Sequence, residues 1–158
     1  MPRKGNKVIK REIAPDSSYG SVVVAKFTNK LMLRGQKATA ERVMYKALAL
    51  ASEQAKESPV DVLEKAIKNV TPSVMVRSRR VGGATYQVPV EVEEERGRSL
   101  AMKWLIISAR THGGGKSMSE KLALALVEAV QGQGAAIKKR DDVHKMAEAN
   151  RAFMHYRW

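Results

Sequence analysis

The chain has 158 residues, the size of one ordinary domain with a single hydrophobic core. Its 29 Lys and Arg against 16 Asp and Glu give a formal net charge of +13, which a polyanion such as nucleic acid would neutralise. The absence of Cys excludes disulfides, thiolate metal sites and Cys nucleophiles, and the three His share no metal-ligand spacing. We therefore expect no metal and no cofactor. The basic first residues lack the apolar core of a secretory signal, and no apolar run is as long as a membrane span, so we expect a soluble cytosolic protein.

The first 11 residues are strongly basic and contain no acid. They offer little apolar surface for packing, so we predict a basic N-terminal arm over 1–19, followed by a single helical domain over 20–158. Such arms often bind nucleic acid, and a merely solubilising tail is the alternative. The candidate contacts in the arm are Arg3, Lys4, Lys7, Lys10 and Arg11.

Apolar residues at i, i+4 and i+8 predict a first helix over about 20–32. Its inward positions are Val23, Val24, Phe27 and Leu31. A basic row without acids follows the opposite side at four-residue spacing and consists of Lys26, Lys30 and Arg34, continuing into Lys37. Like charges at this spacing destabilise an isolated helix. The row therefore suits a phosphate backbone, with an ordinary solvated face as the alternative.

Two more helices follow the break at Gly35. The second is predicted over about 38–56, and its many small inward residues permit close helix packing. The pair Ser58-Pro59 is a start signal for the third helix, because Ser is a good N-cap and Pro fits the first turn. The 3-4-3 spacing of apolar residues from Val60 then continues until Pro72.

The apolar period changes to two over 73–92, on both sides of Gly82-Gly83. This pattern predicts a β-hairpin with a two-residue turn, in which Arg80 faces Thr85, Arg79 faces Tyr86 and Arg77 faces Val88. An isolated hairpin is marginal in water, so an arginine-bearing hairpin either packs on the helices or protrudes towards a partner. Arginine suits phosphate contacts and base stacking, and Tyr86 offers a further stacking surface.

Glu91 and Glu93 to Glu95 are predicted to lie at the start of a fourth helix, because the helix dipole favours negative charge at an N-terminus. Paired carboxylates serve as acid and base in some enzymes. These stand in an exposed run without a His, a metal pattern or an apolar pocket, so we expect no catalytic residue and no small-molecule substrate.

The stretch Gly113-Gly114-Gly115-Lys116-Ser117 looks like the end of a phosphate-binding loop. The first Gly of that motif is replaced by Arg110, and the residues before it have helical spacing, whereas the motif follows a buried strand. We therefore predict a turn that ends the fourth helix, and a fifth helix over 117–130 opened by a Ser117–Glu120 capping box. Arg110, His112 and Lys116 would make this turn attractive to anions.

A last helix is predicted from Ala135 towards Asn150, with Lys138, Lys139 and Arg140 in its first turns. Cations there interact unfavourably with the helix dipole, and a bound anion would relieve this. The closing residues mix Arg with aromatic side chains, including Trp158, that can stack on bases. For Phe153 and Met154 the alternative is a tail docked over the core.

Several segments, in order, make the chain resemble the bacterial form of the small-subunit ribosomal protein seven family over nearly its whole length. They are "FTNKLMLRGQKATAERVMYKAL", "RRVGGATYQVPVEV", "LAMKWL", "ARTHGGGKSMSEKLA", "GQGAAIKKRDDVHKMAEANRAF" and "HYRW". The resemblance implies a mainly helical fold, a bundle of about six helices with a protruding two-stranded β-hairpin, and no enzymatic activity.

The resemblance also implies function and partners. Such proteins bind the head (three-prime major) domain of the small-subunit ribosomal RNA and nucleate its assembly, in the cytoplasm or in an organelle. Their hairpin lies near the exit-site tRNA and the mRNA exit path, and small-subunit ribosomal proteins nine and eleven are neighbours. The alternative is a general basic nucleic-acid-binding protein without ribosomal specificity.

Carried onto this chain, the implied RNA surface joins the arm, the basic row, the hairpin arginines, Arg96 with Arg98, and the turn from Arg110 to Lys116. Two departures stand out. Gln36 occupies a position where the family often has Lys, and Gly97 interrupts a basic run. We expect weaker RNA contacts at both.

Overall fold

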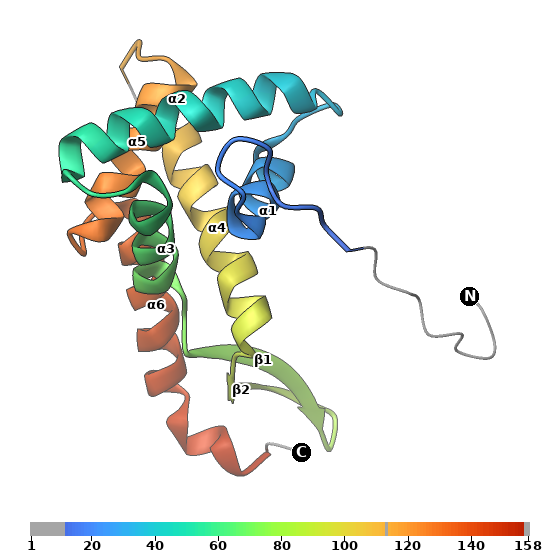
Figure 1. The fold of residues 1–158 in the computed structure, drawn as a ribbon. Coiled ribbons are helices and arrows are strands. Elements are labelled where there is room, and N and C mark those ends of the chain that lie inside the picture. The colour runs from blue at the N-terminus through green and yellow to red at the C-terminus, as the bar shows by residue number, and fades with distance from the viewer. Residues whose placement is uncertain (1–11, 113, 157–158) are drawn as a thin grey trace.

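The computed structural model describes residues 12–112 and 114–156. Within them the chain forms six α-helices, one antiparallel hairpin and a short 3-10 helix, which confirms the predicted mainly helical fold. The hairpin extends from the lower end of the helical body, next to the C-terminal segment (Figure 1). In chain order the elements are α1 (Val22–Leu31), α2 (Lys37–Ala55), α3 (Pro59–Val70), β1 (Val74–Val81), β2 (Ala84–Glu91), α4 (Glu94–Thr111), α5 (Met118–Val130), α6 (Ala135–Ala149) and the 3-10 helix η1 (Arg151–Tyr156).

Helix α5 forms the centre of the body, where it packs against α2, α3, α4 and α6. Its Leu122 and Leu126 have no exposed surface. Much of its remaining buried surface is alanine, and its neighbour α2 also has fully buried alanines, Ala47 and Ala51. Small side chains let helix backbones approach closely at native packing density. Helix α5 is therefore part of the hydrophobic core.

The inward faces of two helices differ slightly from the predicted ones. In α1, Thr28 is buried, while Val23 is only half-buried. In α3, Val62 and Ala66 join the core, and Val60 is half-buried. Successive residues of a helix are about 100° apart, so an apolar stripe defines its inward face only to within about one residue.

The boundaries follow local signals with one exception. Ser58 is the N-cap of α3 and Pro59 its first residue, as predicted, although the Ser58 side chain makes no capping hydrogen bond. Glu91, predicted at the start of the fourth helix, is instead the last residue of β2, where it pairs with Val74. Strand pairing continues as far as Glu91, so α4 begins only at Glu94. Within the described ranges, no helix is long and apolar enough to cross a membrane.

Candidate nucleic-acid interface

The hairpin has the predicted register, with Arg77 opposite Val88, Arg79 opposite Tyr86 and Arg80 opposite Thr85. Gly82 and Gly83 both have positive φ, 56° and 91°, as a two-residue turn of this kind requires. Side chains alternate between the two faces of a strand. The three arginines are therefore divided, two on the face that carries Tyr86 and one on the opposite face.

The faces near the turn differ in their surroundings. Arg80 shares its face with Ser78 and Gln87, which hydrogen-bond to each other across the strands at 3.0 Å, and all three side chains are exposed. On the other face Arg77 is exposed, while Arg79 and Tyr86 are half-buried. The tip thus presents guanidinium groups in two directions, and charged groups of this geometry suit contacts with phosphate.

Tyr86 was predicted as a stacking surface for a base. In the structure its ring is half-buried and lies against two aromatic rings of η1, with centroid distances of 5.2 Å to Phe153 and 5.1 Å to Tyr156. The docked tail suggested for Phe153 and Met154 is therefore correct only in part. Phe153 docks on the hairpin, and Met154 is 46 % exposed.

The basic row of the first helix is shorter than predicted. Helix α1 ends at Leu31, and Arg34 lies in the following loop with a left-handed φ of 53°. Only Lys26 and Lys30 share the helix face. Beyond the loop, Lys37 opens α2 and pairs with Glu41 at 3.6 Å. The four-residue spacing continues in sequence but not in space, because the chain turns before Arg34.

Lys30 links α1 to the start of α4. Its Nζ donates to the Ser99 hydroxyl at 2.6 Å and to the Ser99 carbonyl at 3.3 Å. In the same part of α4, Arg98 pairs with Glu94 at 2.6 Å, and Arg96 is exposed. The predicted basic residues Lys26, Lys30, Arg96 and Arg98 therefore line a single groove between α1, α3 and α4.

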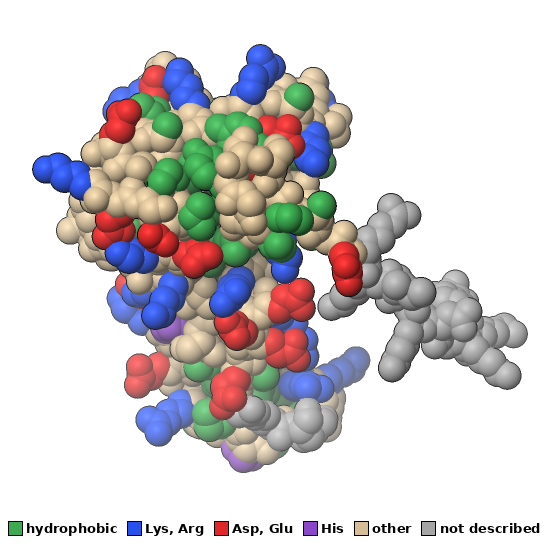
Figure 2. All heavy atoms as spheres, in the orientation of Figure 1, with side chains coloured by type: hydrophobic (Ala, Val, Ile, Leu, Met, Phe, Trp, Pro, Cys, Tyr) green, Lys and Arg blue, Asp and Glu red, His purple; other side chains and the backbone are tan. Residues whose placement is uncertain are grey.

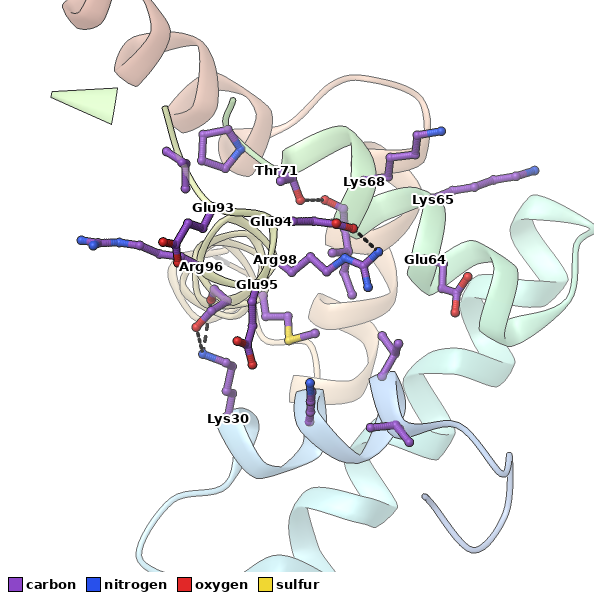
Figure 3. A pocket seen from close by; sticks show the side chains of 18 of the residues that line it. Lys30, Glu64, Lys65, Lys68, Thr71, Glu93, Glu94, Glu95, Arg96 and Arg98 are labelled. Atoms are coloured by element: carbon purple, nitrogen blue, oxygen red, sulfur yellow. Dashed lines mark hydrogen bonds and ion pairs between the residues drawn. The ribbon is translucent and has the colours of Figure 1, made fainter. Parts of the chain in front are cut away.

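This groove, of about 1830 Å³, has a mixed charge that was not predicted. Figure 3 shows Lys30 of α1 near the first turns of α4, with Glu64, Lys65 and Lys68 of α3 at another side. Lys and Arg are interspersed with Asp and Glu on the face seen in Figure 2. The charged lining consists of six basic residues, Lys26, Lys30, Lys65, Lys68, Arg96 and Arg98, and six acidic ones, Glu57, Asp61, Glu64, Glu93, Glu94 and Glu95.

The structure explains why a glycine stands at position 97. The sequence suggested a missing basic contact, but Gly97 is buried where α4 meets the end of α3. A Cβ atom here would lie 2.8 Å from Thr71 Cγ2 and 3.4 Å from the Pro72 carbonyl oxygen. The position therefore has no room for a side chain, which gives Gly97 a packing role, and the weaker RNA contact expected there stays a prediction.

We expect Gly97→Ala to lower the free energy of unfolding by about 1 kcal/mol, because overpacking outweighs the gain in helix propensity. The Thr71 methyl group cannot easily move away, since its hydroxyl donates to the Ile67 carbonyl at 2.7 Å. In a Thr71→Ser background, which lacks that methyl group, the same change should be neutral or stabilising. Urea unfolding of the four proteins measures this, and stabilisation by Gly97→Ala in both backgrounds would contradict it.

The turn between α4 and α5 is a helix-to-helix connection, as predicted, and not a phosphate-binding loop. Ser117 and Glu120 form the capping box, with the Ser117 hydroxyl accepting from the Glu120 N–H at 3.4 Å and Glu120 Oε2 accepting from the Ser117 N–H at 3.2 Å. Of the predicted anion contacts, Arg110 donates to the Leu31 carbonyl at 3.1 Å and His112 lies 3.9 Å from Glu128. Lys116 is exposed.

At the start of α6 the predicted contacts Lys138 and Lys139 are exposed. The next residue, Arg140, was predicted only as a third cation of these first turns. It donates to the Asn69 carbonyl and pairs with Asp141 at 2.6 Å, so it attaches α6 to α3. Its basic neighbours in the sequence concealed this structural role.

Sequence reasoning also missed the anchor of the N-terminal segment. The Asp16 carboxylate is 8 % exposed, and it accepts from the backbone N–H groups of Ser18 and Tyr19 and from the Tyr45 hydroxyl. An Asp followed by two Ser is a local signal for such a turn. The contact with Tyr45 on α2, at 2.9 Å, has no local signal. Six predicted contacts, Arg3, Lys4, Lys7, Lys10, Arg11 and Trp158, lie outside the described residues.

Comparison with known proteins identifies relatives over the whole chain. The sequence profile of the family described as ribosomal protein S7p/S5e matches residues 2–151. The chain is 58 % identical to the small ribosomal subunit protein uS7 of Nitrosococcus oceani over 158 residues, covering all of both chains. Proteins with the same name from Sorangium cellulosum and Dehalococcoides mccartyi are 57 % and 53 % identical, also over the full length of both chains.

Proposed function

Because the chain belongs to the ribosomal protein S7p/S5e family, and is therefore a non-enzymatic, ribosome-associated constituent of the small subunit, we propose that it is a primary binder of the head domain of the small-subunit ribosomal RNA. In this role it nucleates assembly of that domain. The observation that carries the proposal is the hairpin register, which brings Arg77, Arg79 and Arg80 next to an exposed turn at one end of a packed body.

A second set of contacts belongs to the helical body. Lys26 and Arg96 border the groove between α1 and α4, and Arg34, Lys37 and Lys116 are exposed on loops or helix ends. The six carboxylates in the groove oppose a phosphate backbone, and Arg98 is already paired. RNA therefore approaches the groove at Lys26 and Arg96 and stays outside its acidic interior. The hairpin supplies a large share of the phosphate contacts.

The mechanism combines charge with shape. Phosphate contacts release counterions and make the affinity depend on salt. The deep groove of an A-form helix is poorly readable by side chains, so specificity comes from the fixed spacing between hairpin and helical body. The proposal includes the family's finer features, a hairpin near the exit-site tRNA and the mRNA exit path and contact with small-subunit ribosomal proteins nine and eleven, in the cytoplasm.

Filter binding tests the proposal. The purified protein is titrated with a head-domain ribosomal RNA fragment and with an unrelated structured RNA of equal length, over a series of salt concentrations. We expect the head fragment to remain bound at salt that removes the control RNA, because a shape-specific complex retains contacts that do not depend on counterion release.

Equal affinities and equal salt slopes for the two RNAs would favour the alternative function, a general basic nucleic-acid binder. The net charge of +13 alone accounts for such binding. A matched duplex DNA in the same series separates this alternative further, because a general binder would hold DNA as tightly as structured RNA.

A further inference from the structure

The 3-10 helix η1 packs on the hairpin. Its Phe153 and Tyr156 are half-buried, and their ring centroids lie 5.2 and 5.1 Å from that of Tyr86. Tyr86 is the sole aromatic residue between 73 and 92 in the sequence. In Figure 1 the segment turns back beneath the hairpin after α6 ends. Tyr86 of the hairpin and Phe153 and Tyr156 of the C-terminal segment thus form a cluster that we call the aromatic brace.

The hairpin has a second attachment at its base. The backbone N–H of Ser73 donates to Nε2 of His144 on α6 at 3.2 Å. Near that end of β2, Val88 and Pro89 are buried. The base is therefore held by the helical body, and the aromatic brace lies further along the hairpin, towards the turn.

The brace lies at the level of the arginine tip, by which we mean Arg77, Arg79 and Arg80. Tyr86 pairs with Arg79 in the ladder, and Arg80 is the next residue along β1. Beyond this point the residues at the turn are exposed or half-buried. A two-stranded hairpin is marginal by itself, so its direction in space depends on what it packs against. Aromatic contacts of this geometry are a specific source of such packing.

We propose that the aromatic brace is a positioning element, which fixes the direction of the arginine tip and thereby raises the affinity for RNA. Phe153 and Tyr156 act through the hairpin and not by touching RNA. This inference rests on the proposed function and deepens it, since it assigns the C-terminal segment 151–156 to the hairpin contact.

The first experiment uses the free protein. Phe153→Ala with Tyr156→Ala removes two rings, and Met154→Ala is the matched control, because Met154 belongs to the same turn and is 46 % exposed. Amide hydrogen exchange at 76–80 and 85–88 should become about tenfold faster in the double variant, with exchange in α5 unchanged. Tyr156→Phe, which keeps its ring, should exchange like the wild type. Unchanged exchange at these positions in the double variant would overturn the inference.

The second experiment is a double-mutant cycle on RNA affinity, with Arg77→Ala and Arg80→Ala as the second perturbation. Removing the brace should weaken binding to the head fragment by about fivefold in the wild-type background and by less than about twofold without those arginines, since coupled residues are not additive. Equal losses in both backgrounds would mean that the rings contact RNA themselves, which overturns the inference. If instead the proposed function is wrong, the wild-type protein itself will bind the head fragment no more tightly than the unrelated RNA.

Discussion

Replacing Arg77, Arg79 and Arg80 together by alanine is expected to weaken binding to the head-domain RNA by about 100-fold, since each charge-assisted hydrogen bond contributes about 1 kcal/mol or more. The slope of log affinity against log salt should decrease in magnitude by about 2 to 3, because each neutralised phosphate contributes about 0.7 to 0.9. Filter binding over a salt series measures both quantities, and circular dichroism checks that the helical content is unchanged.

A control with the same change in charge separates this local effect from net charge. Arg42, Lys46 and Lys145 are exposed on α2 and α6, outside the predicted contacts. Replacing these three residues by alanine also reduces the formal net charge from +13 to +10. If both triple variants lose the same affinity and the same slope, the hairpin has no special role and only the total charge matters.

The hairpin could be predicted in detail because its information is local. Gly82-Gly83 defines a two-residue turn, and a turn of known length determines every pair in the ladder. The same is true of α5, whose capping box depends on two residues, Ser117 and Glu120, three positions apart. Features that depend on residues close together in the sequence could therefore be predicted from the sequence alone.

The features that were missed depend on contacts between distant segments. Gly97 and Thr71 are 26 positions apart, and their close approach explains why Gly97 carries no side chain. The acidic residues of the groove come from α3, α4 and the residues just before each helix, so its mixed charge arises only when these segments meet α1. Arg34 was misplaced for a related reason, since the chain leaves the helix at Leu31. Charge counted along the sequence does not show which charges share a surface.

These corrections change which residues matter for the proposed function. Three basic residues of the groove have partners, namely Lys30 with Ser99, Lys65 with Glu57 and Arg98 with Glu94. Arg110 and Arg140 hold elements together. Cations that already have partners gain less from a phosphate, because binding must first replace those contacts. For the proposed function, the arginine tip can present its charges together only if it is held in place, and this makes the packing of the body a requirement for binding.

The packing requirement leads to the second large effect. Phe27→Ala is expected to lower the free energy of unfolding by about 3 to 5 kcal/mol, because it removes a buried ring and leaves a cavity. Phe27 has no exposed surface and belongs to the main core cluster. Urea unfolding followed by circular dichroism measures the change, which should appear as a lower midpoint with an unchanged slope.

Leu33→Ala is the matched control, because Leu33 lies just after α1 and is 59 % exposed. It should change the free energy of unfolding by less than about 0.5 kcal/mol. A loss below about 1 kcal/mol for Phe27→Ala would contradict the importance of α1 for the core. Domains of this kind are stable by only about 5 to 15 kcal/mol, so the expected loss is a large part of the total.

RNA should offset much of this loss if the protein binds it in the folded state only. A ligand at about 1,000 times its dissociation constant adds about 4 kcal/mol to the stability of the state that it binds. Phe27→Ala should therefore unfold at lower urea when free and regain most of its stability with the head fragment. The variant lacking the hairpin arginines should have wild-type stability when free and gain little from the same RNA. The two variants together separate the stability of the body from the contact that the hairpin makes.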